Sequence, residues 1–340
     1  MSVFGKLFFV LLLIFTAITL SANEHDENVR KILNSSGLHI DFKEVEKGKT
    51  LSIIREDQEK TDSAIALSMI LYVKAPYKDV LQRIKKGDGR LSDYKYAKQI
   101  YVADLNNFAD YFNEIGFVKS ENDEYDKLFE YERDNSFNLS IQEINKLNEF
   151  KKKFKNNRQK GATKFYQEIL KARFEAYLKR GIDGISAYEH CDKDATVESC
   201  FKKSSLGMNV FRNYFKDMYK SYMDYPKLAS DDINQKFFII KDKIDGRVAF
   251  VLKHQMLQSR DNLMLIAERQ FYISNSLDAI QTQILCTPYK SGSIVVLSVQ
   301  SYTDKVSGFA RGVAVRFGRS MMKKQIKPMF DDLEEKFNKK

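Results

Sequence analysis

The most informative segment of the sequence is residues 263–302, which read LMLIAERQFYISNSLDAIQTQILCTPYKSGSIVVLSVQSY. Apolar and polar side chains alternate through much of it, and the pattern breaks at Ser274-Asn275 and again at TPYKSG (287–292). Alternation with period two is typical of strands that bury one face, and breaks this short are typical of antiparallel connections. The stretch therefore predicts three antiparallel strands, at Leu263–Ile273, Leu277–Cys286 and Ser293–Tyr302.

The pattern extends in both directions from this stretch. Upstream, Phe237–Ile240 and Arg247–Leu257 are predicted to lengthen the antiparallel series to five strands. Downstream, a long helix is predicted from Val306 to Phe337, because apolar residues recur there near every 3.6 positions. The sheet has one apolar face and the helix has one apolar stripe, and each must be buried against a partner. The fold class that follows is α+β, with a curved antiparallel sheet gripping a long C-terminal helix.

The remaining chain divides into a first part of this domain and a large helical insertion. Residues 38–88 contain predicted strands at Leu51–Arg55 and Ala64–Val73 and a helix at Tyr77–Ile84. Residues 89–232 are predicted to be mainly helical, with one helix opened by the capping box Ser140-Ile-Gln-Glu143. The other helices are expected at 108–115, 162–180 and 206–222. Residues 233–340 then complete the sheet and its helix.

The N-terminus predicts export. Met1–Lys6 carries one lysine and no acid, and the apolar run LFFVLLLIFTAITL (7–20) follows, before the small residues Ser21 and Ala22. This is the order of a secretory signal over residues 1–22, and the run is shorter than the roughly 20 residues of a membrane span. Retention of the segment as an anchor is the alternative. We expect a periplasmic or secreted protein, which argues against nucleic acid as a partner despite the net charge of +10.

Export also gives the cysteines a meaning. Cys191 and Cys200 enclose the polar stretch DKDATVES, and in an oxidising compartment we expect them to form a disulfide. Two reduced surface thiols are the alternative. Cys286 lies in the apolar run QILC and is predicted to be a buried thiol. The sequence has no HExxH, GxSxG or phosphate-loop motif and no metal-binding cluster of cysteine and histidine, so no metal, cofactor or catalytic residue is predicted.

Several segments resemble the START-related helix-grip superfamily. The similar segments are Ala64–Val73 with Ala75-Pro76 and Val80, and then Leu263–Ile273, Ser293–Tyr302 and Gly308–Lys324. More closely, FNLSIQEI (137–144), AERQFYISNSLDA (267–279) and the GFARGV run after Ser307 resemble a group of uncharacterised exported bacterial proteins. The resemblance implies a cavity for a lipid or another hydrophobic ligand beneath the C-terminal helix. The helical insertion departs from the compact superfamily.

Two polar residues interrupt the apolar faces of the central strands. His254 shares the even-numbered face of 247–257 with Val, Phe, Leu and Met, and Arg269 shares the odd-numbered face of 263–273 with Leu, Ala, Phe271 and Ile. If these faces point at the cavity, both residues meet a polar headgroup or carboxylate there, with Phe271 and the helix residue Phe309 as apolar neighbours. The alternatives are that His254 bonds a backbone carbonyl and that Arg269 reaches the sheet edge or pairs with an acid.

The opposite face of 263–273 carries Glu268, Gln270 and Tyr272. Glu268 and Tyr272 are expected to meet solvent or the helical insertion. This face matters for a catalytic alternative, in which Glu268 or His254 serves as a base in a cyclase or hydrolase of the kind found on related folds.

Positive charge is concentrated on one helical hairpin. Residues 141–180 hold 12 Lys and Arg but only 4 Glu, and KKKFKNNRQK (151–160) has no acid at all. One interpretation is a solvated helix end, and the other is a surface that meets anionic lipid through Lys151, Lys152, Lys153 and Lys155.

The favoured function is an exported protein that holds a hydrophobic or amphipathic ligand, such as a lipid, between the sheet and the C-terminal helix. An envelope protein that contacts a protein partner through the basic insertion is the first alternative, and the enzyme is the second.

Overall fold

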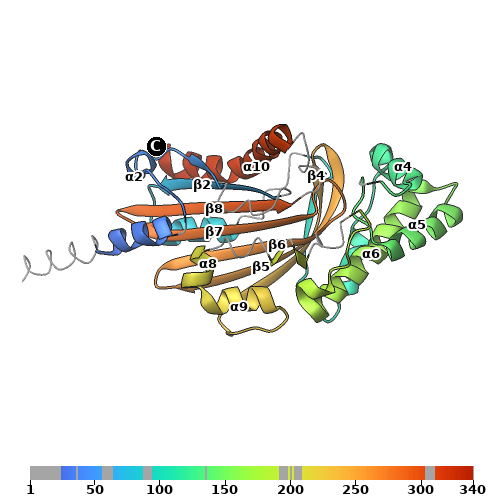
Figure 1. Ribbon diagram of the computed structural model, residues 1–340, viewed down its shortest axis with the longest axis horizontal. Helices are drawn as coiled ribbons and strands as arrows, with labels where there is room; N and C mark the ends of the chain where they lie inside the picture. Colours follow the sequence, from blue (N-terminus) through green and yellow to red (C-terminus); the bar gives the residue numbers. More distant parts are fainter. Residues whose placement is uncertain are drawn as a thin grey trace, which may run out of the picture.

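One eight-stranded antiparallel sheet forms the centre of the molecule (Figure 1). Its strand order is β1-β2-β8-β7-β6-β5-β4-β3, and all neighbouring strands are antiparallel. The strands are β1 Leu51–Ile54, β2 Ala64–Val73, β3 Lys98–Tyr101, β4 Asn234–Ile244, β5 Arg247–Arg260, β6 Leu263–Ile273, β7 Ala279–Tyr289 and β8 Gly292–Tyr302. The computed structural model describes residues 24–35, 37–55, 64–86, 94–134, 136–190, 198–199, 201–202, 209–302 and 311–339.

Helices lie on both faces of the sheet and at one of its ends. Besides a helix over residues 24–35, the α-helices are α2 Phe42–Val45, α3 Tyr77–Lys86, α4 Asn122–Glu130, α5 Ile141–Lys153, α6 Arg158–Arg180, α8 Asn209–Tyr214, α9 Lys216–Asp224 and α10 Arg311–Leu333. Short 3-10 turns cover Phe108–Glu114, Lys119–Glu121 and Gly181–Gly184, and a π-helical turn at Glu334–Asn338 ends the chain's last helix.

The two faces of the sheet are covered by different helices. On one face, called the α10 face here, α3 and α10 bury a cluster with β2, β7 and β8. On the other, the α6 face, the helix at 24–35 packs with α2, α6, α8 and α9. Period-two alternation explains the division, because adjacent residues such as Val296 and Leu297 of β8 enter opposite clusters.

The antiparallel sheet and the long last helix are as predicted, and most element bounds agree closely. Ala64–Val73 and Leu263–Ile273 have the expected ends, and Ser140 forms the expected capping box with Glu143. The helix expected at 206–222 is two helices within the described residues, α8 and α9, which meet at Phe215. One strand, β3, was not predicted; it comes from the segment assigned to the helical insertion and pairs with β4.

A bulge in β6 corrects the predicted face of Tyr272. Leu252 of β5 pairs with Tyr272, but the next residue, Lys253, pairs with Gln270, so Phe271 is the extra residue. The pleat shifts by one position there. Tyr272 therefore joins Phe271 in the core of the α6 face, and Ile273 enters a small cluster with Val251 and Ile280 instead.

Helices α4–α6 form a lobe at one end of the sheet (Figure 1). Two ion pairs attach it: Lys241 of β4 contacts Glu121 at 2.8 Å in a buried pair, and the half-buried Arg247 of β5 contacts Glu124 at 2.6 Å. Asn138 adds hydrogen bonds from its side-chain amide to the carbonyls of Ile273 and Leu277. The lobe is thus held on the sheet by ion pairs and hydrogen bonds.

Some predicted features lie outside the described residues. These are the signal segment 1–22, the cysteines Cys191 and Cys200, and Phe309. Cys286 is described, and it is the buried free thiol that the sequence predicts. In the part of the chain that the structure describes, none of the helices combines the length and apolar character needed to cross a membrane.

Candidate functional site

A row of polar side chains crosses the α6 face of the sheet. His254 of β5, Arg269 of β6, Gln281 of β7 and Gln300 of β8 are successive cross-strand partners. All four are buried, and His254 and Arg269 have no exposed surface. Buried polar groups require hydrogen-bond partners. If the protein itself supplies these partners, the row has no groups left to bind a ligand.

Arg269 is enclosed by aromatic rings and holds its charge without an acid. Its guanidinium lies 3.9 Å from the centroid of the Tyr222 ring. One Nη donates to the Tyr177 hydroxyl at 3.2 Å and the other to the Tyr222 carbonyl at 2.9 Å, whereas Nε has no hydrogen-bond partner among the described residues. Among the described residues no carboxylate forms an ion pair with it. Arg269 therefore neither reaches the edge of the sheet nor, among the described residues, pairs with an acid, which were the two alternatives expected from the sequence.

The imidazole of His254 is neutral, and each of its two nitrogens makes a hydrogen bond. Burial, reinforced by the charge of Arg269, lowers the pKa of His254 well below its usual 6.5. Its Nε2 lies 3.0 Å from the Gln235 side-chain oxygen and its Nδ1 lies 2.9 Å from the Tyr177 hydroxyl. The Gln235 oxygen can only accept, so Nε2 carries the proton and Nδ1 accepts from Tyr177. Side chains, and not a backbone carbonyl, satisfy this histidine.

The expected ligand residues therefore lie away from the C-terminal helix. His254, Arg269 and Phe271 are on the α6 face, opposite α10, and Phe271 stacks on Tyr177 with 3.8 Å between ring centroids. Side chains of α10, including Phe330 and Leu333, are buried against the other face. Among the described residues, the row His254–Arg269 thus acts as a polar contact that joins α6 and α9 to the sheet.

A groove on the α10 face has the features of a binding site. It lies over β3–β6 beside α3 and has a cavity volume of about 160 Å³. We call it the lysine groove; its lining residues are Ile84, Lys85, Gln99, Tyr101, Lys236, Phe238, Lys253, Gln255, Leu257 and Ile266. Apolar side chains from β4, β5 and β6 alternate there with lysines and glutamines.

The charges of the lysine groove are only partly neutralised. Lys253 contacts Glu268 at 3.1 Å, and Gln255 donates to the same carboxylate at 2.7 Å. Lys236 and the exposed Lys85 have no ion pair within the described residues. Within the described residues, the buried side-chain oxygen of Gln99 accepts no hydrogen bond. The Lys236 ammonium lies 6.0 Å from the centroid of the Tyr101 ring. In the part of the chain that the structure describes, the groove therefore offers an apolar floor, two lysines without an ion pair and one unused acceptor.

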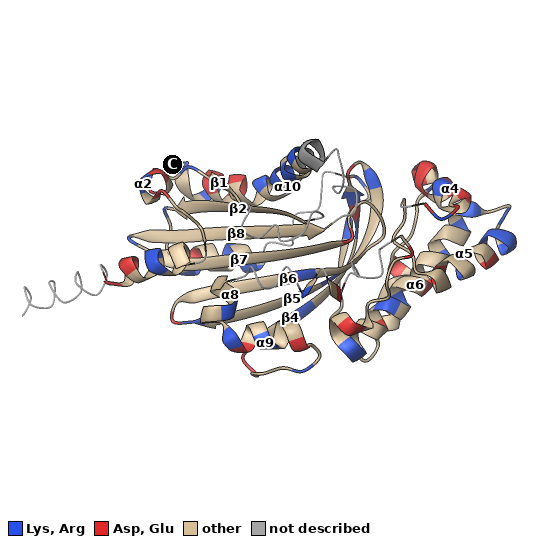
Figure 2. Ribbon diagram, in the orientation of Figure 1, with Lys and Arg blue, Asp and Glu red and all other residues tan. Residues whose placement is uncertain are grey.

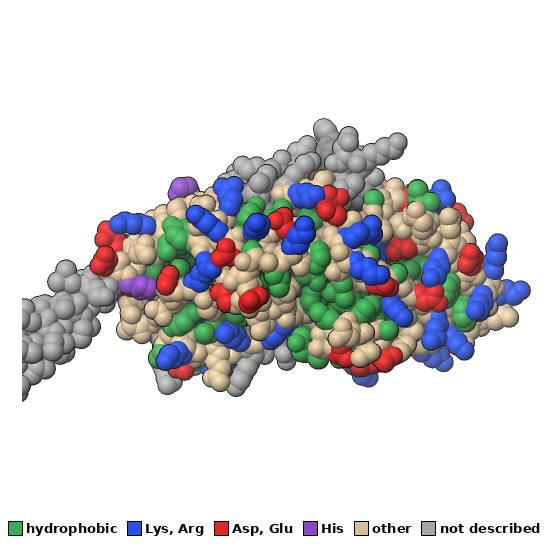
Figure 3. All heavy atoms as spheres, turned by 90° about the horizontal axis from the view of Figure 1, so that it is seen from below, with side chains coloured by type: hydrophobic (Ala, Val, Ile, Leu, Met, Phe, Trp, Pro, Cys, Tyr) green, Lys and Arg blue, Asp and Glu red, His purple; other side chains and the backbone are tan. Residues whose placement is uncertain are grey.

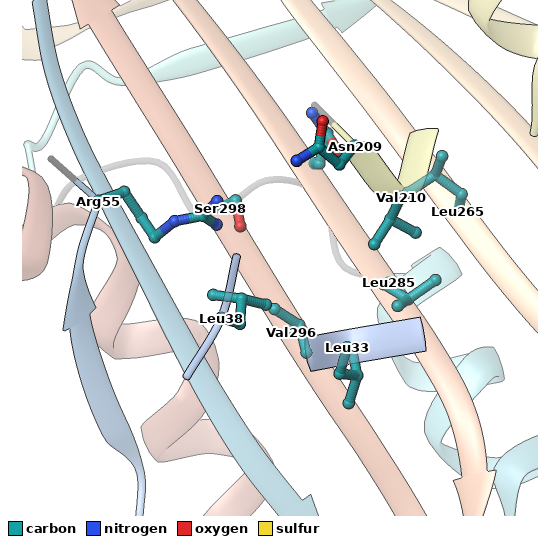
Figure 4. A pocket seen from close by; sticks show the side chains of 10 residues that line it. Leu33, Leu38, Arg55, Asn209, Val210, Leu265, Leu285, Val296 and Ser298 are labelled. Atoms are coloured by element: carbon teal, nitrogen blue, oxygen red, sulfur yellow. The ribbon is translucent and has the colours of Figure 1, made fainter. Parts of the chain in front are cut away.

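A second, smaller pocket lies on the α6 face beneath the helix at 24–35 (Figure 4). We call it the Arg55 pocket; it is lined by Leu33, Leu38, Arg55, Asn209, Val210, Leu265, Gln283, Leu285, Val296 and Ser298. Arg55 extends toward Ser298 and donates to Ser68, whose hydroxyl is 2.7 Å from that of Ser298. The cavity volume is about 30 Å³, room for very few water molecules.

The described residues offer little for catalysis. They contain no group of three or more His, Cys, Asp or Glu side chains that could hold a metal ion. Burial raises the pKa of the Cys286 thiol to about 12, so it is not a thiolate near neutral pH. His254, the histidine of the enzyme alternative, lines neither pocket.

Comparisons with protein-family models, with curated proteins and with solved structures found no match to this chain. The fold and the groove therefore carry the functional argument, and the resemblance to helix-grip proteins stays a prediction.

The residues of the lysine groove were not among the predicted site residues. Lys253 and Gln255 alternate along β5 with the apolar residues of its other face. From this alternation alone, both positions would be predicted to face solvent. The odd-numbered face of β5 carries the signal that could have identified them. Two polar residues, Lys253 and Gln255, are followed on that face by the apolar residue Leu257. Gln99 and Tyr101 come from β3, a strand that was not predicted from the sequence.

Proposed function

We propose that the protein is an exported, periplasmic binding protein without catalytic activity, and that it holds an amphipathic, anionic molecule such as a lipid in the lysine groove. The proposal keeps the ligand on the sheet face that carries α10 but places it beside that helix, over β3–β6. The observation that carries it is that one groove combines an apolar floor with two lysines, Lys85 and Lys236, that form no ion pair among the described residues.

The lining residues indicate which part of the groove would contact each end of the ligand. Phe238, Leu257 and Ile266 would contact its apolar part, since these side chains form the floor. Lys236 would bind the anionic group; Lys253 is less suited because Glu268 already neutralises it. A typical ligand pocket encloses about 300–1,000 Å³, so the groove would hold only the part of a lipid nearest its headgroup.

Binding of a dansyl-labelled fatty acid, followed by its fluorescence, tests this proposal. The variant Lys236→Met keeps the apolar stem of the side chain and loses its charge, so the affinity of the protein for the probe should fall by about tenfold. Lys220→Met removes an exposed lysine on α9, on the other side of the sheet, and is the matched control. Equal affinities of both variants and the wild type would place the probe elsewhere.

Leu257→Lys provides a second arm of the same test. Leu257 lies on the groove floor, and a charge there should abolish binding of the apolar chain. Circular dichroism must show an unchanged fold. If a folded Leu257→Lys variant binds the probe as the wild type does, the groove is not the site.

A further inference from the structure

The turn between α5 and α6 carries a cluster of cations that the fold leaves unpaired. The segment 151–160, called the basic turn here, has six basic residues and no acid. Two of the six are engaged: Lys151 donates to the Tyr131 carbonyl at 2.7 Å, and Arg158 contacts Asp126 and Glu130. The other four are exposed and form no ion pair within the described residues: Lys152, Lys153, Lys155 and Lys160.

Helix electrostatics account for only part of this cluster. Lys152 and Lys153 lie in the last turn of α5, where cations are favourable. Lys160, however, lies in the first turn of α6, which contains no acid, and a cation there opposes the helix dipole. Lys155 lies between the helices and repels its neighbours. The stability of the hairpin therefore does not explain why these four charges gather.

The basic turn is held in a fixed shape. The rings of Phe150 and Phe154 stack with centroids 5.6 Å apart. Gly161 packs so closely that a Cβ there would lie 2.6 Å from side-chain atoms of Phe154 and Phe129. Lys and Arg residues lie along the helices of the α4–α6 lobe (Figure 2), and their side chains are seen at that end of the molecule (Figure 3). The cations are thus presented together, on a lobe that ion pairs attach to the sheet.

We infer that the basic turn docks the protein on an anionic lipid bilayer. Lysines near such a surface each contribute about 1 kcal/mol, or about fivefold in partitioning, without specific geometry. A nucleic-acid surface is favoured less, because single strands are bound by exposed stacking aromatics, and the aromatic residue of the turn, Phe154, is packed on Phe150. The inference is independent of the lysine groove, since the basic turn lies on a different part of the molecule.

Vesicle sedimentation of the full chain tests the inference. Vesicles of phosphatidylcholine are compared with vesicles in which one quarter of the lipid is phosphatidylglycerol, at 0.1 M salt. Any apolar contribution of the N-terminal segment 7–20 is common to both lipids, so the ratio of the two partition coefficients isolates charge. We expect Lys152→Ala/Lys153→Ala/Lys155→Ala to lower partitioning to the anionic vesicles about 100-fold.

The matched control removes three exposed lysines elsewhere. Lys216→Ala/Lys220→Ala/Lys227→Ala has the same net charge as the first variant, and its sites are on or beside α9. We expect less than a threefold loss. Equal losses in the two variants would mean that only net charge matters and would overturn the inference. So would tight binding to a DNA duplex at the same salt, lost in the first variant, with weak binding to the vesicles.

Discussion

His254 and Arg269 lie directly opposite one another on β5 and β6, and a single hydroxyl, that of Tyr177, bonds them both. Arg269 donates to this oxygen, and the hydroxyl proton goes to His254 Nδ1. Gln235 completes the series by accepting from His254 Nε2. Because Tyr177 belongs to α6, this network joins that helix to the sheet, and its members Tyr177, His254 and Arg269 are buried.

Removing the hydroxyl of Tyr177 tests the network. In Tyr177→Phe, Arg269 and His254 each lose a partner while buried, so we expect the free energy of unfolding to fall by about 1–3 kcal/mol. Urea unfolding followed by circular dichroism measures it. Tyr272→Phe is the control, because the Tyr272 hydroxyl is also buried but finds no hydrogen-bond partner in the described part of the chain. This variant should be neutral or slightly more stable. A larger loss in Tyr272→Phe than in Tyr177→Phe would refute the assignment.

The depressed pKa of His254 makes stability depend on pH. An unfolded histidine binds its proton near pH 6.5, whereas folded His254 does so only at much lower pH. Below about pH 6.5 the unfolded chain therefore holds more protons, and stability should decrease as pH falls, by up to about 1.4 kcal/mol per pH unit. Comparing the wild type with His254→Gln at pH 7.5 and 5.5 isolates this contribution. The same pH dependence in both proteins would contradict it.

Gly181, at the end of α6, allows the backbone of Tyr225 to approach. A Cβ at Gly181 would lie 1.9 Å from the Tyr225 carbonyl oxygen, and Tyr225 in turn stacks on Tyr177. Gly246 also has a positive φ, of +76° against +60°, but among the described residues no atom lies within 4 Å of its Cβ position. Gly181→Ala should therefore cost about 1–3 kcal/mol more than Gly246→Ala. Equal melting temperatures of the two variants would count against this close approach.

The ion pair of Lys241 and Glu121 should contribute strongly to docking of the lobe. Both side chains are at most 5 % exposed, so Lys241→Met leaves a buried carboxylate unpaired at a cost of about 3–5 kcal/mol. Lys98→Met breaks the exposed pair with Glu114 and should cost less than about 1 kcal/mol. Limited proteolysis of the lobe gives a second measurement, with faster cleavage in Lys241→Met. Similar losses of stability in the two variants would show that burial of the pair is unimportant.

The sequence was most informative where residues interact with near neighbours. Alternation correctly placed His254 and Arg269 on one buried face, because the pleat fixes which residues share a side. It could not say which helix covers that face, since this depends on the path of the chain over hundreds of residues. The short strand β3 was missed because only Ile100 of its four residues is buried. Without β3, the edge of the lysine groove could not be foreseen.

Native mass spectrometry of the protein purified from a periplasm shows whether the lysine groove holds an anionic amphiphile. We expect one extra mass per chain, which organic extraction releases as an anionic lipid class and which is absent from Lys236→Met. A bare protein mass in the wild type, unchanged after incubation with envelope lipids, would mean that the groove does not hold such a ligand.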